Sequence, residues 1–144
     1  MVAPEPCVRE LDKLAQNLYL AAPTPAQYAA LAAFEPETLA ILGKRVREFK
    51  ARRDYLVPAL KQLGFDIPVT PQGAFYIYAG CGKLTKDSFA FARDLLERAG
   101  VAITPGIDFG SNTPERHVRF AYTNSIERLE EGVARIEKFL EAGN

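Results

Sequence analysis

The residue types that most often carry chemistry are scarce in this sequence. It has one histidine, His117, and two cysteines, Cys7 and Cys81. Two cysteines are too few for a disulfide scaffold, and a lone histidine with scattered carboxylates does not give the ligand spacing of a metal site. A hydrolytic triad needs a nucleophile beside the histidine, and neither cysteine is near His117 in the sequence. Metal centres and hydrolytic triads are therefore disfavoured.

The sequence also lacks net charge, long apolar runs and a secretion signal. Eighteen basic residues balance eighteen acidic ones, so no field favours binding to nucleic acid or to an anionic membrane. No apolar run approaches the roughly 20 residues that span a bilayer, and the first residues lack the basic-then-apolar layout of a signal peptide. Together with the low cysteine content, these features favour a cytoplasmic protein.

The first half of the chain has the spacing of helices. Apolar residues recur at helical intervals over residues 6–19, 24–33 and 36–64. Thr24 is expected to cap the second helix with Gln27 completing a capping box, and the small and apolar residues 28–33 predict that this helix is buried. Pro58 should kink or interrupt the third helix, and Gly64 stands where a C-terminal glycine cap belongs.

The second half alternates between strand and helix patterns. Strands are expected over residues 74–78, 101–104 and 117–122, and helices over 87–98 and 125–140. Gly100 should close the first of these helices, and Asn124 with Glu127 offers a capping box for the last. The fold class is α/β (α+β): a small mixed sheet with helices packed on one face, preceded by a helical segment.

Arg119 is the strongest candidate for a functional residue. In the strand over 117–122, alternation places it with His117 and Ala121 on one face, opposite Val118, Phe120 and Tyr122. A buried guanidinium must find an anion, and its planar fork suits a carboxylate. The residues alone leave two possibilities: an internal partner such as Asp108 or Glu115, or the carboxylate of a ligand.

Several segments occur in the order and spacing of a known family. They are residues 1–5 with 8–11, residues 17–19 with 24–31, Arg52-Arg53-Asp54 with Leu56 and Leu60, Pro71-Gln72-Gly73-Ala74-Phe75-Tyr76, Thr104-Pro105-Gly106-Ile107-Asp108-Phe109-Gly110, and Val118-Arg119-Phe120-Ala121. Together they resemble the C-terminal portion of class I/II aminotransferases of the aspartate aminotransferase type, which use pyridoxal 5′-phosphate (PLP).

This resemblance implies a fold and a set of roles. Residues 65–144 would form the small domain of the PLP fold, residues 36–64 the long connecting helix, and residues 1–35 helices that pack on a PLP domain and a subunit interface. Arg119 would bind the substrate carboxylate, with Gly73 and Phe75 beside the substrate and Phe109 at the mouth of the site. The implied activity moves an amino group between an amino acid and a 2-oxo acid, in a homodimer or higher oligomer.

The family's cofactor-binding motifs do not occur in this sequence. In the family, a Ser-x-Ser-Lys segment supplies the lysine that forms a Schiff base with PLP, and a following Gly-x-Arg-x-Gly helps to hold the phosphate; neither pattern is found here. We therefore expect no catalytic residue in this chain, no retention of PLP and no turnover by the chain alone. Two alternatives stay open: a stand-alone carboxylate- or amino-acid-binding regulatory module, and a PLP lyase or synthase of the same fold.

Overall fold

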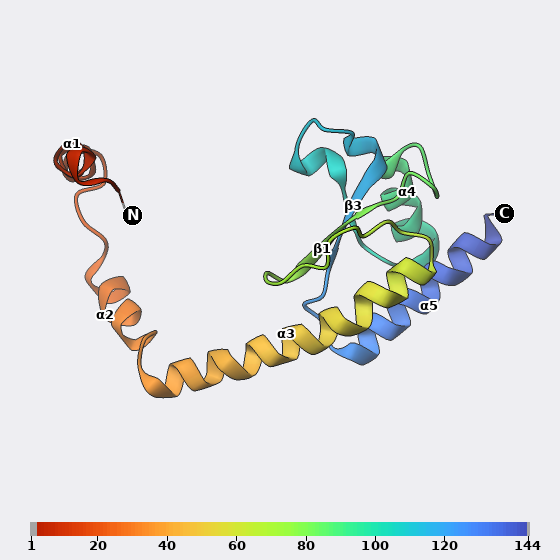
Figure 1. Ribbon diagram of the computed structural model, residues 1–144, viewed down its shortest axis with the longest axis horizontal. Coiled ribbons are helices and arrows are strands. Elements are labelled where there is room, and N and C mark those ends of the chain that lie inside the picture. The colour runs from red at the N-terminus through yellow and green to blue at the C-terminus, as the bar shows by residue number, and fades with distance from the viewer. Residues whose placement is uncertain (1–2, 144) are drawn as a thin grey trace. The chain divides into compact units, whose positions relative to one another are not determined.

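The computed structural model describes residues 3–143 (Figure 1). Contacts divide the chain into two compact units, with the boundary between Lys44 and Arg45 inside a long helix. Met1 and Val2, which belong to the first segment of the family resemblance, lie outside the described residues. The three-part division at residues 35 and 64 stays a prediction.

The first unit is helical, as expected. It contains α1 (Glu5–Leu18), α2 (Thr24–Ala32) and the beginning of α3 (Pro36–Gln62). Neither α1 nor α2 buries a single residue, and Tyr28 in α2 is 70% exposed. The prediction that α2 is buried was therefore wrong for this chain, because the apolar residues of α2 find no covering layer within it.

Two predicted helix signals also act differently from expectation. Thr24 is the first residue of α2 rather than its cap, and Gln27 donates its side-chain amide to the Ala22 carbonyl at 2.8 Å instead of completing a capping box. Pro58 does not interrupt α3, since Leu56, Val57 and Leu60 around it are buried and their packing offsets the lost backbone hydrogen bond. Gly64 does end the helix, with a φ of +94°.

The second unit is built on a three-stranded sheet with the order β1-β3-β2. The strands are β1 (Tyr76–Gly80), β2 (Thr104–Pro105) and β3 (His117–Ala121). The α/β fold class is confirmed, but the described strands pair antiparallel throughout rather than in the expected mixed sheet. β1 begins two residues later than predicted because Ala74 has a positive φ of 60°, which is incompatible with an extended strand.

The remaining helices are α4 (Ser88–Asp94), which continues into a π-helical turn over Leu95–Ala99, and α5 (Ile126–Ala142). The Asp87 carboxylate caps α4, and Gly100 closes the π turn with a φ of +65°. Ser125, not Asn124, occupies the N-cap position of α5, and a hydrogen bond with the Ser125 side chain holds the pKa of Glu127 below its usual value. None of the described helices is both long and apolar enough to cross a membrane.

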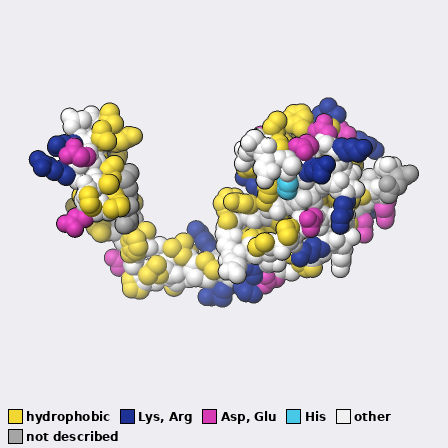
Figure 2. Space-filling view, turned by 45° about the horizontal axis from the view of Figure 1, so that its top comes forward, with side chains coloured by type: hydrophobic (Ala, Val, Ile, Leu, Met, Phe, Trp, Pro, Cys, Tyr) yellow, Lys and Arg dark blue, Asp and Glu magenta, His cyan; other side chains and the backbone are white. Residues whose placement is uncertain are grey.

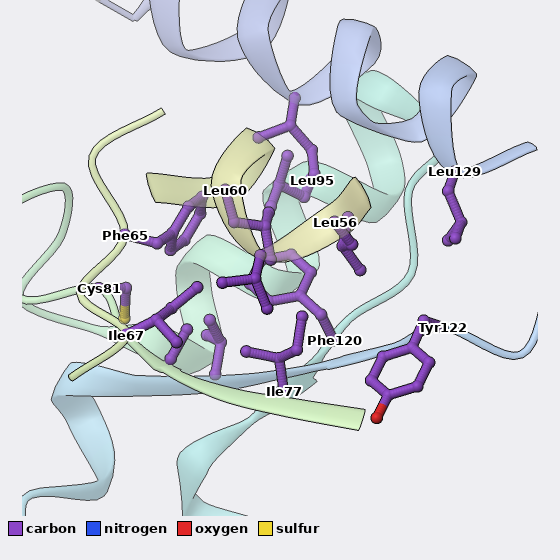
Figure 3. Packing of buried hydrophobic residues seen from close by; sticks show 14 of the residues in the cluster. Leu56, Leu60, Phe65, Ile67, Ile77, Cys81, Leu95, Phe120, Tyr122 and Leu129 are labelled. Carbon is purple, nitrogen blue, oxygen red and sulfur yellow. The ribbon is translucent and has the colours of Figure 1, made fainter. Parts of the chain in front are cut away.

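The core lies on one face of the sheet. Side chains from α3, the π turn and α5 pack against the strands (Figure 3). The alternation predicted for the last strand is confirmed, because Val118, Phe120 and Tyr122 are 0%, 6% and 1% exposed. Each such side chain contributes about 1.5–3 kcal/mol by its removal from water. The α-helices α3, α4 and α5 all contribute side chains to this core, so they cover this face of the sheet rather than the opposite one.

The two thiols should differ strongly in reactivity. Cys81 is fully buried, and burial raises the pKa of its thiol to about 11, whereas Cys7 is exposed. Since the thiolate is the reacting species, iodoacetamide at neutral pH should label Cys7 and spare Cys81 until the chain is unfolded. Mass spectrometry of native and urea-treated samples checks this. Equal labelling of both cysteines in the native chain would contradict the burial of Cys81.

Candidate functional site

The face of the sheet opposite the core carries a group of polar and aromatic side chains, here called the open face. It consists of Tyr76, Tyr78, Thr104, His117 and Arg119. The register pairs Arg119 with Tyr78 of β1 on one side and with Thr104 of β2 on the other. Paired residues of an antiparallel sheet point to the same side, so these three side chains form a row with Arg119 at its centre.

Arg119 has no carboxylate partner among the described residues. Asp108 and Glu115, the internal partners considered from the sequence, are exposed, and Glu115 lies 3.8 Å from Arg116 instead. The Arg119 Nη2 donates to the Thr104 hydroxyl at 3.2 Å, while its Nε is buried without a hydrogen-bond partner. A buried N–H left in this way is costly, so Arg119 is the charged residue of this face whose hydrogen bonding is incomplete among the described residues.

Aromatic rings hold the guanidinium in place. Its central carbon lies 4.8 Å from the centre of the Phe109 ring and 5.7 Å from that of Tyr76. Tyr78 contacts the edge of Phe109 and stacks on His117 with ring centres 5.0 Å apart. Each cation–π contact contributes about 0.5–1 kcal/mol at such a site. Because a ring face is at best a weak hydrogen-bond acceptor, these contacts orient the guanidinium without supplying strong partners for its N–H groups.

Phe109 reaches Arg119 through a short 3-10 helix over Gly106–Phe109, which directly follows β2. Gly106 is buried, and a Cβ placed on it would overlap the Pro114 carbonyl oxygen and lie 2.8 Å from that of His117. The Pro114 carbonyl is itself fixed by the Ser88 hydroxyl, which donates to it at 2.8 Å. Glycine at position 106 therefore lets the Phe109 loop lie directly against the start of β3.

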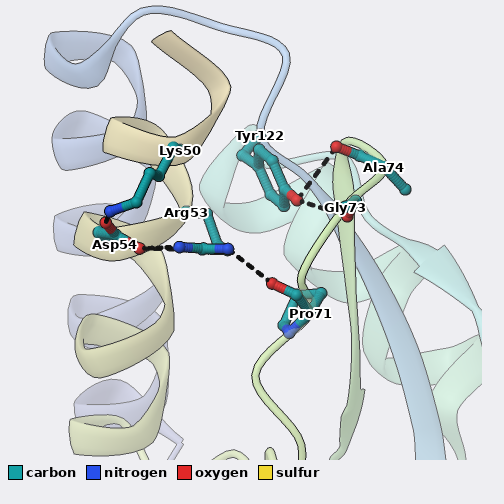
Figure 4. A network of polar contacts seen from close by, with 7 residues as sticks. All are labelled: Lys50, Arg53, Asp54, Pro71, Gly73, Ala74 and Tyr122. Carbon is teal, nitrogen blue, oxygen red and sulfur yellow. Dashed lines mark hydrogen bonds and ion pairs between the residues drawn. The ribbon is translucent and has the colours of Figure 1, made fainter. Parts of the chain in front are cut away.

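Gly73 and Phe75, two other residues predicted for the site, lie in the turn that precedes β1. The Phe75 ring packs edge-on against Tyr76 at 5.6 Å, which links it to the aromatic group around Arg119. Gly73 has open space where a Cβ would stand, and its carbonyl accepts a hydrogen bond from the Tyr122 hydroxyl (Figure 4). The structure thus brings Phe109 into contact with Arg119, whereas Phe75 contacts Tyr76, which in turn contacts Arg119. Their roles toward a substrate stay predictions.

Tyr76, Tyr78 and Thr104 are additional members of the site that sequence reasoning missed. The alternation of β1 could have identified the two tyrosines, whereas Thr104 joins the site only through its pairing with β3. His117 is at the edge of the open face, with Nδ1 2.9 Å from the Thr113 carbonyl oxygen. Within residues 3–143 no group of three His, Cys, Asp or Glu side chains could hold a metal ion.

The sequence matches one protein family along most of its length. Residues 1–136 match the family model described as Aminotransferase class I and II. The (5-formylfuran-3-yl)methyl phosphate transaminase of Methanocaldococcus jannaschii is 39% identical over 97% of this chain and 36% of its own length. The valine–pyruvate aminotransferase of Mycobacterium tuberculosis is 34% identical over the same shares. The chain therefore spans about a third of the length of these curated relatives.

Solved structures give the same result. The crystal structure of an aminotransferase from Mycobacterium tuberculosis superposes with a TM-score of 0.90 at 35% sequence identity, over 97% of this chain and 36% of that one. The similarity thus extends to the fold as well as to the sequence.

Replacing Gly106 with alanine should destabilise the second unit and displace the Phe109 loop. The added methyl group meets backbone oxygens that cannot move aside, so we expect a loss of about 1–3 kcal/mol in the free energy of unfolding. Gly132→Ala is the matched control: Gly132 lies in α5 with open space around it, and alanine should stabilise that helix by about 0.5–1 kcal/mol. Urea unfolding followed by circular dichroism measures both. Equal stability of the Gly106 variant and the native chain would contradict the close approach.

Proposed function

The chain belongs to the class I and II aminotransferase family, and on this premise we propose that it supplies the substrate-carboxylate site of a PLP-dependent aminotransferase. The proposal rests on the incomplete bonding of Arg119. Among the described residues its guanidinium has no carboxylate partner, and its buried Nε has no hydrogen-bond partner. The proposed substrates are an amino acid and a 2-oxo acid, each bound through its carboxylate by this arginine.

The surroundings of Arg119 favour a carboxylate over other ligands. A guanidinium presents parallel N–H groups that match the two oxygens of a carboxylate. Phe109 and Tyr76 cover parts of the site with low-polarity surface, which weakens the competition from water and strengthens the ion pair. A substrate held in this way would be oriented by its α-carboxylate, so that its amino or carbonyl carbon takes a fixed position.

The family implies PLP as cofactor, and the described residues fit the substrate better than they fit this group. The three strands that form the open face carry no lysine, and their one cationic side chain is Arg119. When bound, PLP supplies an electron sink for the amino-acid carbon. We propose that the 144-residue chain alone neither retains PLP nor catalyses turnover, while its half of the substrate site stays competent to bind a carboxylate.

The exposed helices of the first unit suggest a partner for the protein. Hydrophobic side chains lie on the surface of α1 and α2 (Figure 2). They include Val8, Leu14, Leu18, Tyr28 and Leu31, each at least 50% exposed. Apolar side chains exposed in this number favour association, so we propose a homodimer or higher oligomer that these helices hold together. A cytoplasmic location is part of the same proposal.

Replacing Arg119 should abolish carboxylate binding by this chain. Pyruvate is the probe, titrated into the labelled chain by NMR. We expect Arg119→Lys to weaken binding roughly tenfold, since the ammonium keeps the charge and loses the two-point geometry, and Arg119→Ala to remove it. Arg128→Ala is the control, because Arg128 is an exposed arginine of α5 that pairs with Glu131. Unchanged pyruvate affinity in Arg119→Ala would overturn the proposed role.

A coupled transaminase assay completes this test. The native chain supplied with PLP and a set of amino donors should show no turnover, although it binds pyruvate. Turnover by the chain alone would refute the proposed division between carboxylate binding and cofactor chemistry. Tight binding of one amino acid without PLP would instead favour a stand-alone sensing module.

The apolar helices should make the chain self-associate. Light scattering at increasing concentration should show a dimer or larger species, and Leu14→Glu with Leu18→Glu should shift it toward the monomer by placing charge on the apolar face of α1. Gln16→Glu adds charge to the same helix at a polar position and should leave the association unchanged. A clean monomer of the native chain at high concentration would contradict the proposal.

A further inference from the structure

The turn that leads into β1 is held in a conformation that its sequence alone does not favour. We call residues 71–75 the 71–75 turn. Ala74 has a φ of 60°, in the left-handed region that residues with a Cβ rarely occupy. Such a conformation persists where surrounding contacts enforce it, and it often does so at functional sites.

Two residues hold the 71–75 turn through its backbone, with their side chains shown in Figure 4. The Tyr122 hydroxyl donates to the carbonyl oxygens of Gly73 and Ala74, each at 3.2 Å, and the Tyr122 N–H donates to Phe75 O at 2.8 Å. The Arg53 Nη1 donates to the Pro71 carbonyl at 2.9 Å. All of these acceptors are backbone oxygens, so the contacts fix the path of the turn rather than any one side chain.

Both holding residues are themselves fixed. Tyr122 is 1% exposed, and its ring packs edge-on against Phe49 with centres 6.2 Å apart, which directs the hydroxyl toward the turn. Burial raises the pKa of Tyr122, so its hydroxyl keeps the proton that it donates. The Arg53 guanidinium is held by Asp54, with Nε 2.9 Å from Oδ1, and Lys50 approaches the other oxygen of Asp54 at 2.7 Å.

The 71–75 turn determines the positions of the aromatic residues Phe75 and Tyr76. Phe75 is its last residue, and Tyr76 follows as the first residue of β1, with its ring 5.7 Å from the Arg119 guanidinium carbon. Tyr122 points to the core face of the sheet, whereas Arg119 points to the open face. Tyr122 therefore influences the open face mainly through the backbone that it holds.

We propose that Tyr122 and Arg53 are positioning residues, which clamp the 71–75 turn so that Phe75 and Tyr76 stand beside Arg119 and support carboxylate binding. The binding part of this inference rests on the proposed function. Whether Tyr122 and Arg53 hold the turn can be measured separately from binding, through the positive φ of Ala74.

The test measures the turn and the ligand in the same samples of the 144-residue chain. A strong NOE between the amide and Hα protons of Ala74 reports its positive φ, and titration with pyruvate gives the dissociation constant. Tyr122→Phe keeps the ring and removes the hydroxyl. Arg53→Lys keeps the charge and replaces the planar guanidinium with an ammonium group. Tyr55→Phe removes a hydroxyl from a half-buried tyrosine elsewhere in the second unit and serves as the control.

We expect Tyr122→Phe to weaken the Ala74 NOE and to raise the pyruvate dissociation constant about three- to tenfold, the range for a lost internal hydrogen bond. Arg53→Lys should act in the same direction, and Tyr55→Phe should change neither measurement. Adding Ala74→Gly to Tyr122→Phe should recover part of the affinity, because glycine adopts a positive φ without strain. A merely structural role for Tyr122 would give no such recovery.

The outcomes separate the clamp from the site. If Tyr122→Phe and Arg53→Lys leave the Ala74 NOE as strong as in the control, the clamp is wrong. If the NOE weakens while pyruvate affinity stays constant, the residues hold the turn and the positioning role is overturned. If Arg119→Ala fails to change pyruvate binding, the proposed function falls and the positioning role falls with it, while the NOE still decides the clamp.

Discussion

The two-residue period of β3 is the constraint on which this small domain depends. Val118, Phe120 and Tyr122 enter the core beneath α3 and α5, and the residue between the first two, Arg119, is forced onto the opposite face. A shift of one residue in the pairing would put a guanidinium in the core and expose the apolar side chains. The packing energy that stabilises the fold therefore also fixes the position of the charged group.

Local patterns predicted more of the fold than of the site. The alternation in β3 and the glycine caps at Gly64 and Gly100 were confirmed, since each depends on residues close together in the sequence. The sequence did not predict the late start of β1, which depends on the backbone conformation of Ala74. It also did not predict the exposure of α2, which depends on which surfaces pack together. Arg119 was identified from its own strand, but its neighbour Thr104 depends on strand pairing, which single-strand patterns do not encode.

The open face combines two interactions that act on the same cation in different ways. Phe109 and Tyr76 attract the guanidinium through their ring faces and so limit its orientation. Hydrogen bonds would limit it too, but they would use the donors that a carboxylate needs. Aromatic contacts do not use these donors in strong hydrogen bonds; among the described residues Thr104 accepts from one nitrogen, and the buried Nε has no partner. This division explains how an arginine can be rigid and yet unsatisfied.

The pairing of β1 with β3 has a kinetic consequence. Tyr76 pairs with Ala121 and Gly80 with His117, so the two strands can meet only after the intervening chain, with α4 and β2, has closed into a loop. Closing such a loop is entropically slow compared with forming helices. We therefore expect the row of side chains around Arg119 to assemble late in folding. A nascent or partly folded chain, however helical, presents the arginine without the aromatic surfaces that orient it.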